Sequence, residues 1–383
     1  MKKLALIVES IDFPGGGKRV ALAFAKTLKK HYTVDLYTFR KINWDLIKKI
    51  TPAFYTMPDN EFVISKFFGE LDLRLPLFFA YKLLIKNWRI SKLKLRDEYD
   101  LIINANGDML MFPGDIIYIF YTTLFLDREI GKYRRFPWNL YIKPYSFIRD
   151  KMFKEYKKSI SHSRIVTLSK YSQSLIQKHF GMPSIIIYPP IDLSLIEEAM
   201  KNNSCSGKER QVISIGRFSP EKELETALYV AKHMPDVRFI LAGGVYSRKS
   251  RNYYLKLIKI TKKLGLDNVK FLTNITDSEK INLLKQSSVY LSTRKNEHFG
   301  ISIVEAMAAY NIPVVYKDGG QWSDIVEYGK YGYGFQNYEE AANAIYEALD
   351  RDCSYRKIIA ESTKRFSFEK FSQDVYDLIN SLK

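Results

Sequence analysis

The chain contains little cysteine, little histidine and no long apolar run. Its two cysteines, Cys205 and Cys353, are far apart among 383 residues, which predicts neither a disulfide framework nor a cysteine-rich metal site and favours a cytoplasmic protein. No stretch approaches the roughly 18 uninterrupted apolar residues of a membrane-spanning helix, so no span is predicted. None of the five histidines stands at metal-ligand spacing from another, and we predict no bound metal.

Acidic residues are in the minority. The formal net charge is +18, with 60 Lys and Arg against 42 Asp and Glu, which favours anionic partners. Residues 62–96 hold eight basic residues and two acids among aromatic and aliphatic ones, and residues 128–158 hold ten basic residues and three acids. The region 62–96 is either a basic amphipathic surface for peripheral contact with an anionic membrane, or an ordinary pair of helices with solvated lysines.

The length and the 46% apolar content indicate two domains with full cores. Short apolar strands alternate with helical segments throughout, which predicts an α/β fold with doubly wound parallel sheets. The polar run from Lys201 to Arg210 is expected to be an exposed loop. Tyr188 is followed by two prolines, which end regular structure and suggest a hinge.

The most informative stretch is Asn296-Glu297-His298-Phe299-Gly300-Ile301, which continues to Glu305. Residues 288–292 predict a buried strand and residues 301–310 a helix in which Glu305 is the only charged residue. Glu305 is therefore either a structural acid paired with a lysine or a group that faces a ligand hydroxyl. Gly300 precedes a helix N-terminus, where unpaired N–H groups and the absence of a Cβ suit a phosphate.

The spacing Glu297-x7-Glu305 resembles the signature of retaining nucleotide-sugar glycosyltransferases of family 4. That resemblance implies the GT-B fold, two Rossmann-like domains facing a central cleft. It implies an acceptor-binding domain over 1–188, joined in space by a C-terminal helix over 367–383, and a nucleotide-sugar-binding domain over 189–366. Within the family, the stretch is most similar to GDP-mannose-dependent alpha-mannosyltransferases of lipid-linked oligosaccharide synthesis.

The resemblance also implies roles for individual residues. On the acceptor side, Phe120 stands where similar enzymes carry a histidine, and Lys18 stands where the mannosyltransferases carry an acid. The expected catalytic residues are Arg217, Lys222 and Glu297; the expected donor-binding residues are Gly16, Gly17, Gly216, Asn274, Ile275, His298, Phe299, Gly300, Ile301 and Glu305; the expected acceptor-side residues are Lys18, Phe120 and Thr122. Positive charge from Arg217, Lys222 and the helix end at Gly300 is expected to replace a metal.

The expected function is therefore retaining transfer of a hexose, mannose from GDP-mannose first, to a lipid-linked or other glycan, without a cofactor. UDP-glucose-dependent glucosyl transfer is the alternative within the same fold. A non-catalytic protein that binds sugar nucleotides, or a basic nucleic-acid-binding protein, is the alternative of another class, although no nucleic-acid recognition module is present. The expected location is cytoplasmic, with peripheral contact at the cytoplasmic face of a membrane.

Overall fold

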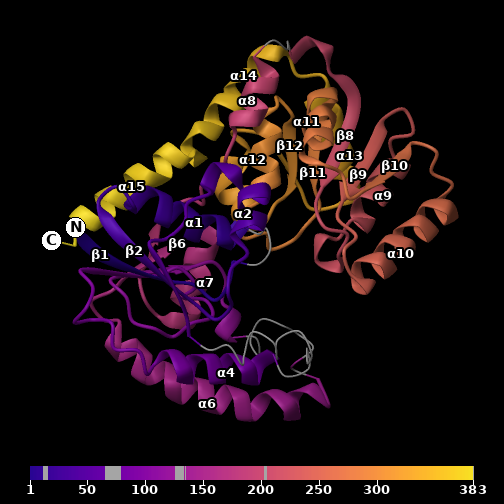
Figure 1. Ribbon diagram of the computed structural model, residues 1–383. Helices are drawn as coiled ribbons and strands as arrows, with labels where there is room; N and C mark the ends of the chain where they lie inside the picture. Colours follow the sequence, from indigo (N-terminus) through magenta and orange to yellow (C-terminus); the bar gives the residue numbers. More distant parts are fainter. Residues whose placement is uncertain (12–15, 65–78, 126–132, 134, 202–204, 383) are drawn as a thin grey trace. The chain divides into compact units, whose positions relative to one another are not determined.

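In a computed structural model, the chain is described over residues 1–11, 16–64, 79–125, 133, 135–201 and 205–382. It divides into two compact units, of which unit 1 comprises residues 1–190 and 368–383 and unit 2 comprises residues 191–367. Each unit is built around one parallel sheet (Figure 1). The predicted fold class of two doubly wound parallel sheets is thus confirmed.

Unit 1 contains a seven-stranded sheet in the order β3-β2-β1-β4-β5-β6-β7. Every strand pair is parallel. The described elements are β1 (Lys2–Ile7), α1 (Gly16–Leu28), β2 (Tyr32–Thr38), α2 (Trp44–Ile50), η1 (Pro52–Phe54), β3 (Asn60–Val63), α4 (Phe79–Ile90), β4 (Leu101–Asn104), β5 (Ile116–Ile119), η3 (Thr123–Phe125), α6 (Trp138–Ser159), β6 (Arg164–Thr167), α7 (Lys170–Phe180), β7 (Ile185–Ile186) and α15 (Phe368–Asn380).

Helices cover both faces of the unit 1 sheet. The central strands are continuous apolar runs because both of their faces are buried, as in β5. Tyr118 of β5 contacts Phe24 of α1 edge-on at 6.0 Å. Ile117 and Ile119 point to the opposite face, where they share a core with residues of α4 and α6. Figure 1 shows α4 and α6 side by side along that face.

The C-terminal helix α15 packs on α1 within unit 1. Phe371 of α15 meets Phe24 edge-on at 5.2 Å, and the Tyr376 hydroxyl donates to the Thr27 carbonyl oxygen at 2.6 Å. The C-terminal helix of the chain therefore lies in unit 1, beside the first helix of that unit. The prediction that the final helix joins the first domain agrees with this packing.

Unit 2 contains a six-stranded parallel sheet in the order β10-β9-β8-β11-β12-β13. Its elements are α8 (Ser194–Met200), η5 (Cys205–Gly207), β8 (Glu209–Ile215), η6 (Pro220–Lys222), α9 (Glu225–Lys232), β9 (Arg238–Gly243), α10 (Arg248–Leu264), β10 (Val269–Thr273), α11 (Asp277–Gln286), β11 (Ser287–Ser292), α12 (Ile301–Ala308), β12 (Ile312–Tyr316), η7 (Gln321–Ile325), η8 (Glu327–Gly329), β13 (Tyr333–Phe335), α13 (Tyr338–Leu349), α14 (Cys353–Glu361) and η9 (Ser362–Phe366).

Two expectations about residues 201–210 are wrong. Cys205 is 5% exposed and forms a disulfide with Cys353, with 5.5 Å between the two Cα atoms. The Lys208 ammonium donates to three carbonyl oxygens, those of Leu284, Lys285 and Ser287, instead of facing solvent. Sequence reasoning missed both because the partners are at least 76 residues away. The cysteine count consequently gives no support for a cytoplasmic location.

Candidate functional site

The candidate site of unit 2 lies where the strand order of its sheet reverses. β8 and β11 are neighbours at this switch point, and their following loops leave in opposite directions along the sheet. The loop after β8 carries Gly216 and Lys222, and the loop after β11 carries Glu297. The topology therefore brings together two segments that are about 75 residues apart in sequence.

Glu297 is the centre of a compact ion cluster. Its carboxylate is 2.8 Å from the Lys222 ammonium and 3.1 Å and 3.2 Å from Nη1 of Arg294. Glu297 is 8% exposed. Burial alone would raise the pKa of Glu297, but the charges of Lys222 and Arg294 outweigh burial and lower it. The cluster is a buried carboxylate with two cations whose side chains remain about a quarter exposed.

Backbone and amide contacts hold this cluster in place. The Glu297 carbonyl accepts from the Gly320 N–H at 2.7 Å. Gly319 has φ 73°, and a Cβ there would lie 2.3 Å from the Glu297 carbonyl oxygen. The fully buried Gln321 donates its amide to the Arg294 carbonyl at 2.7 Å. The loop after β12 thus fixes the loop after β11.

Gly300 ends that loop and precedes α12. Glycine adopts its φ of 119° readily, whereas a residue with a side chain would be strained there. A Cβ at this position would also lie 2.6 Å from Cδ1 of Ile303. The residue therefore leaves the N–H groups of the first turn, which begins at Ile301, close to the Glu297 cluster. Phe299 is 4% exposed and packs edge-on against Phe366 at 5.2 Å, which anchors the loop.

His298 is uncharged at neutral pH in this setting. Burial and the Arg294 charge lower the pKa of His298 to about 4. A neutral imidazole beside a carboxylate and two cations can accept or donate one hydrogen bond without adding charge.

Glu305, two turns into α12, forms an ion pair. Both of its oxygens lie 3.3 Å from the Lys280 ammonium, and Lys280 also lies 3.2 Å from Asp277. Glu305 is 7% exposed. The pairing with a neighbouring lysine was one of the two interpretations of this acid, and it does not preclude the other, since a carboxylate can accept more than one hydrogen bond.

A water-sized space of about 20 Å³ lies beside the cluster, lined by Gly216, Lys222, Glu297 and Gly300 among others. Four residues expected at the site are thereby shown to share one cavity wall. Arg217 is not part of that wall. Its side chain is 71% exposed and lies 3.6 Å from Glu221.

The turn after β10 holds the two residues expected to read a nucleobase. Asn274 has φ 55°, its N–H donates to the Gly243 carbonyl, and its side-chain oxygen accepts from the Val245 N–H, both at 2.8 Å. These contacts stabilise the turn itself. Ile275 beside it is partly buried.

Unit 1 groups some of its expected residues. A Cβ on Gly17 would lie 3.3 Å from the Phe120 ring, so the start of α1 rests against the end of β5. Gly16 is the first residue of α1 and Lys18 is partly buried, while Gly15 lies outside the described residues. Thr122 is 1% exposed, and its hydroxyl has no hydrogen-bond partner among the residues that the structure describes.

Sequence reasoning assigned no site role to four polar residues that the structure places in or beside these groups, although it expected the loop of Gln321 to face the same crevice. Arg294 and Gln321 belong to the Glu297 cluster, and Lys280 pairs with Glu305. Asp108 in unit 1 is 6% exposed, and burial raises its pKa to about 7. The only signal for Arg294 in the sequence was its position three residues before Glu297. An exposed loop arginine could stand at the same spacing, so the position alone did not indicate an ion pair.

The chain contains one Asp-x-Asp triplet, Asp350-Arg351-Asp352, a pattern with which metal-dependent sugar transferases hold a divalent ion. Asp352 caps α14 by accepting from the Tyr355 N–H, and Asp350 accepts from Arg210. Across the described part of the chain, no three His, Cys, Asp or Glu side chains are grouped as a metal site, and no helix is long and apolar enough to cross a membrane.

Comparison with known sequences gives a family match for unit 2. Residues 196–365 match the family described as glycosyl transferases group 1. The GDP-Man:Man(3)GlcNAc(2)-PP-Dol alpha-1,2-mannosyltransferase of Dictyostelium discoideum is 31% identical over 221 residues, which cover 54% of this chain and 44% of that protein. The human alpha-1,3/1,6-mannosyltransferase ALG2 is 25% identical over 67% of this chain and 66% of its own length. The chain thus spans less than half the length of the first of these relatives.

Solved structures extend the likeness to both units. Anabaena HepE, solved in complex with UDP, superimposes with a TM-score of 0.69 at 18% identity over 99% of this chain and all of that one. WaaG, a glycosyltransferase involved in lipopolysaccharide biosynthesis, gives a TM-score of 0.64 at 15% identity, covering 98% and 99% of the two chains. At these identities the likeness concerns the fold, and the predicted GT-B class is confirmed. The chain therefore has a GT-B fold, and its residues 196–365 match the glycosyl transferases group 1 family.

Proposed function

We propose that this protein is a retaining glycosyltransferase that moves a hexose, mannose from GDP-mannose in the first instance, to a lipid-linked or other glycan without a metal. The observation that carries the proposal is the Lys222–Glu297–Arg294 cluster beside the α12 N-terminus, within the segment that matches the glycosyltransferase family. Cations, a helix end and a buried carboxylate in one place suit a sugar diphosphate.

In this proposal each group has one task. The first N–H groups of α12 and the Lys222 ammonium bind the diphosphate, and Gly300 provides the positive φ with which the loop enters α12. Glu297 accepts hydrogen bonds from sugar hydroxyls, and Arg294 keeps Glu297 ionised. Glu305 accepts from the ribose hydroxyls. Arg217, now exposed, supplies a second cation by a change of side-chain rotamer.

The transfer step needs little from the protein beyond position and charge. The bond from the sugar C1 to the phosphate oxygen breaks, and the bond from C1 to the acceptor oxygen forms on the same face. The acceptor proton passes to the leaving phosphate oxygen. Lys222 and the α12 N-terminus stabilise the negative charge that grows on that oxygen.

Calorimetric titration with GDP-mannose, UDP-glucose and UDP-N-acetylglucosamine, first with EDTA and then with Mg²⁺, tests the donor. We expect metal-independent binding of GDP-mannose. Preference for UDP-glucose would replace the donor and keep the fold and reaction. Absence of binding to all three would favour a non-catalytic protein.

Variants test the assigned roles. Lys222→Ala and Glu297→Ala should each abolish measurable transfer, whereas Lys259→Ala, on the exposed side of α10, should not. Wild-type transfer by either site variant would refute the assignment. Proton NMR of the product distinguishes retention from inversion at C1, and an inverted product would contradict the retaining mechanism.

A further inference from the structure

Helix α6 has two sharply different faces. The buried one holds Ile142, Tyr145, Arg149, Phe153 and Tyr156, which recur every three or four residues. The opposite face has the same spacing and is exposed throughout. We call it the outward face of α6, and its residues are Leu140, Lys143, Phe147, Lys151, Lys154 and Lys158.

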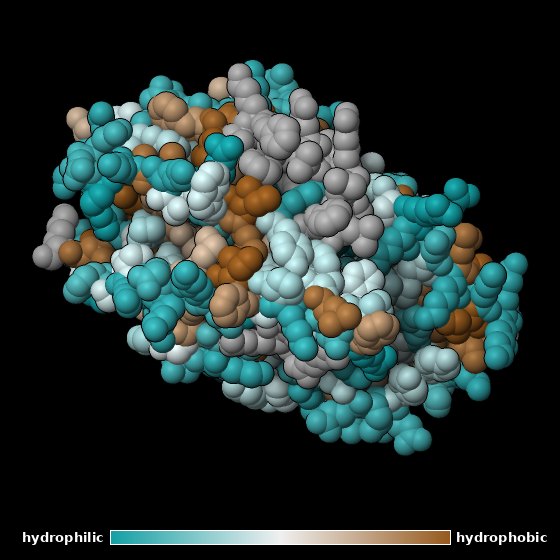
Figure 2. All heavy atoms as spheres, turned by 90° about the horizontal axis from the view of Figure 1, so that it is seen from below, coloured by the Kyte–Doolittle hydropathy of each residue, from teal (hydrophilic) through white to brown (hydrophobic). Residues whose placement is uncertain are grey.

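Large apolar side chains occupy part of this outward face. Leu140 is 58% exposed and Phe147 is 76% exposed. Scattered apolar residues are normal on a protein surface. Here, however, Ile148 adjoins Phe147, and Ile85 and Trp88 are 40% and 50% exposed on α4, the helix that packs beside α6. Figure 2, which views the molecule from below, shows brown apolar side chains interspersed with teal hydrophilic ones.

The charges around these apolar residues are mostly positive. The outward face carries four lysines, of which Lys158 lies 3.5 Å from Glu155, and the neighbouring Asp150 lies 2.8 Å from Arg149. On α4, the Trp88 ring is flanked by the Lys92 ammonium at 4.1 Å and by the Arg89 guanidinium at 5.3 Å. Amphipathic indole and flanking cations are typical of side chains that lie at a lipid–water boundary.

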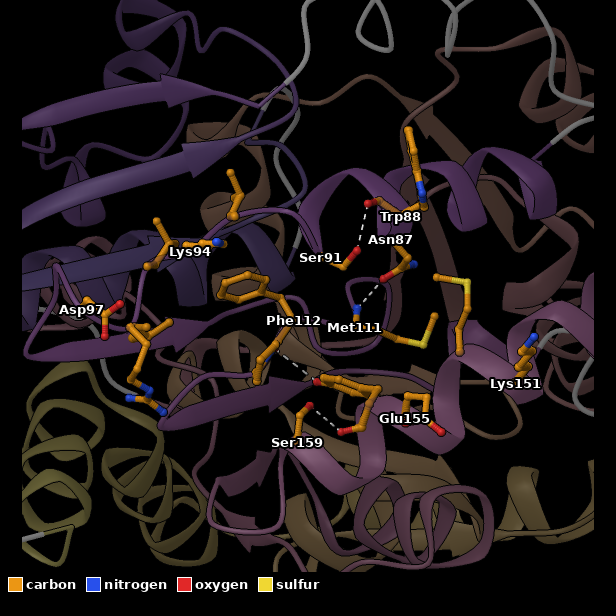
Figure 3. A pocket seen from close by; sticks show the side chains of 17 residues that line it. Asn87, Trp88, Ser91, Lys94, Asp97, Met111, Phe112, Lys151, Glu155 and Ser159 are labelled. Carbon is orange, nitrogen blue, oxygen red and sulfur yellow. Dashed lines mark hydrogen bonds between the residues drawn. The ribbon is translucent and has the colours of Figure 1, made fainter.

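A large hollow opens beside the two helices. Its volume is about 810 Å³, and its lining includes Trp88 of α4, Lys151 of α6, Met111 and Phe112, which are labelled in Figure 3. The hollow lies near the C-terminal ends of α4 and α6. These ends adjoin the starts of β4 and β6, so the hollow is at the opposite edge of the sheet from Phe120 and Thr122. It is therefore separate from the acceptor-side residues.

We propose that the outward face of α6, together with Ile85 and Trp88 of α4, docks on an anionic lipid bilayer. Leu140, Phe147 and Trp88 enter the boundary between headgroups and acyl chains, and the lysines contact lipid phosphates. The hollow beside Trp88 gives an apolar wall for the first carbons of an acyl chain. This inference deepens the proposed function by naming the surface that would bring the enzyme to a lipid-linked acceptor. It also extends to α6 the membrane contact expected for 62–96, a region that includes Ile85 and Trp88 and of which residues 65–78 lie outside the described residues.

Vesicle sedimentation tests the electrostatic part. The protein should bind vesicles of phosphatidylcholine with about 30% phosphatidylglycerol, and moderate salt should release it. Reversing three charges, in Lys143→Glu/Lys151→Glu/Lys154→Glu, should weaken binding about 100-fold or more, from about fivefold per lysine. The matched control is Lys259→Glu/Lys262→Glu/Lys263→Glu on α10, which makes the same charge change in unit 2 and should weaken binding less than tenfold. Equal losses in both variants would overturn the proposal, since net charge would then explain the binding.

Lipid-specific quenching tests the insertion. Doxyl groups placed high on the acyl chain should quench tryptophan fluorescence in the wild type, and Trp88→Phe should remove most of that quenching. Unchanged quenching in Trp88→Phe would refute insertion at this face. Phe147→Ser should weaken binding to the same vesicles; if instead the protein forms dimers that Phe147→Ser abolishes, and binds no vesicles, the face pairs two copies of the chain.

Donor titration on the same variants separates this inference from the proposed function. Unit 2 carries the candidate donor site, so the α6 variants should bind GDP-mannose as the wild type does. Vesicle binding without any donor binding would reject the enzyme and retain the surface, and the reverse result would reject the surface alone. Equal thermal unfolding midpoints show that the variants are folded.

Discussion

At the scale of single residues, the chemistry of unit 2 depends on a carboxylate that stays charged while buried. Desolvation disfavours the ionised form of Glu297, and the two neighbouring cations reverse that effect. Removing a cation leaves the buried Glu297 carboxylate with less compensation, and removing Glu297 leaves two partly exposed cations without their anion. The cluster of Glu297, Lys222 and Arg294 therefore contributes to the stability of unit 2 as well as forming the proposed binding site.

Glu297→Gln should therefore change activity and stability together. The amide keeps the shape of the side chain but leaves Lys222 and Arg294 without an anion, so we expect at least a 100-fold loss of transfer. Because both cations remain partly exposed, the free energy of unfolding should fall by only about 2 kcal/mol. Glu209→Gln, which breaks the exposed pair with Arg238, is the control and should change it by less than about 1 kcal/mol. Wild-type kcat in Glu297→Gln would contradict this role.

His298 gives a prediction about pH. Its pKa in the folded protein, about 4, lies below the ordinary value of 6.5, so only the unfolded chain takes up this proton between these values. The free energy of unfolding is unaffected by His298 above pH 6.5 and decreases as pH falls to about 4, by at most about 3 kcal/mol. Guanidinium titrations at several pH values should show that His298→Asn removes this decrease. If the free energies of unfolding of the wild type and of His298→Asn fall in parallel as the pH is lowered, His298 does not cause the decrease.

At the scale of elements, glycines decide how closely the loops of unit 2 approach one another. A Cβ on Gly243 would lie 1.6 Å from the Gly216 carbonyl oxygen, so β9 can end against the loop after β8 only because that side chain is missing. Gly319 allows the same closeness to Glu297. The loops after β8, β9, β11 and β12 thus form one layer above the carboxyl ends of the strands.

Gly300→Ala tests the junction between the loop after β11 and α12. Alanine at φ 119° is strained, and its Cβ would meet Ile303. Gly265→Ala is the matched control, because Gly265 has φ 63° with open space around its Cβ position. We expect Gly300→Ala to lose about 2 kcal/mol more unfolding free energy than Gly265→Ala, as measured by denaturant titration. Equal losses of unfolding free energy in the two variants would show that the backbone between the loop and α12 accommodates the added Cβ at little cost.

At the scale of the whole molecule, long-range connections determine what each unit contains. α15 returns the end of the chain to unit 1, and the disulfide ties the segment before β8 to the start of α14 in unit 2. The two cysteines are 148 residues apart in the sequence. The disulfide therefore closes a long loop and lowers the conformational entropy of unfolded unit 2.

Reduction should therefore destabilise unit 2 in particular. The loop-entropy relation gives an upper value of about 5 kcal/mol, and we expect about 2 to 4 kcal/mol. Calorimetric scans with and without dithiothreitol should show a lower unfolding temperature for the transition that nucleotide donors raise. Cys205→Ser/Cys353→Ser should match the reduced protein and be insensitive to dithiothreitol. A wild-type transition unmoved by reduction would show that the bond contributes nothing.

Local pattern sufficed for much of the fold. The strand predicted over 288–292 is observed as β11 (Ser287–Ser292), and the helix predicted over 301–310 is observed as α12 (Ile301–Ala308). Helices α11 and α13 were not predicted. The apolar spacing of α11 is less regular than that of α7, whereas the sequence of α13, with its buried alanines and Ile345, did carry a helical pattern. Of the expected site residues, Gly216, Lys222, Glu297 and Gly300 line one cavity, and the exposed Arg217 lies outside that lining; their roles stay predictions.

The sequence alone determined the parallel sheets, because apolar runs buried on both faces fold in no other arrangement when helices alternate with them. It also singled out the segment that holds the buried acids Glu297 and Glu305, because Gly300 lies between them at the start of a helix. Only the tertiary structure decided that Arg294 and Lys222 share one carboxylate, that Lys280 pairs with Glu305, and that Cys205 meets Cys353. Partners of this kind are chosen by strand order and loop packing, and these have no local signature in the chain.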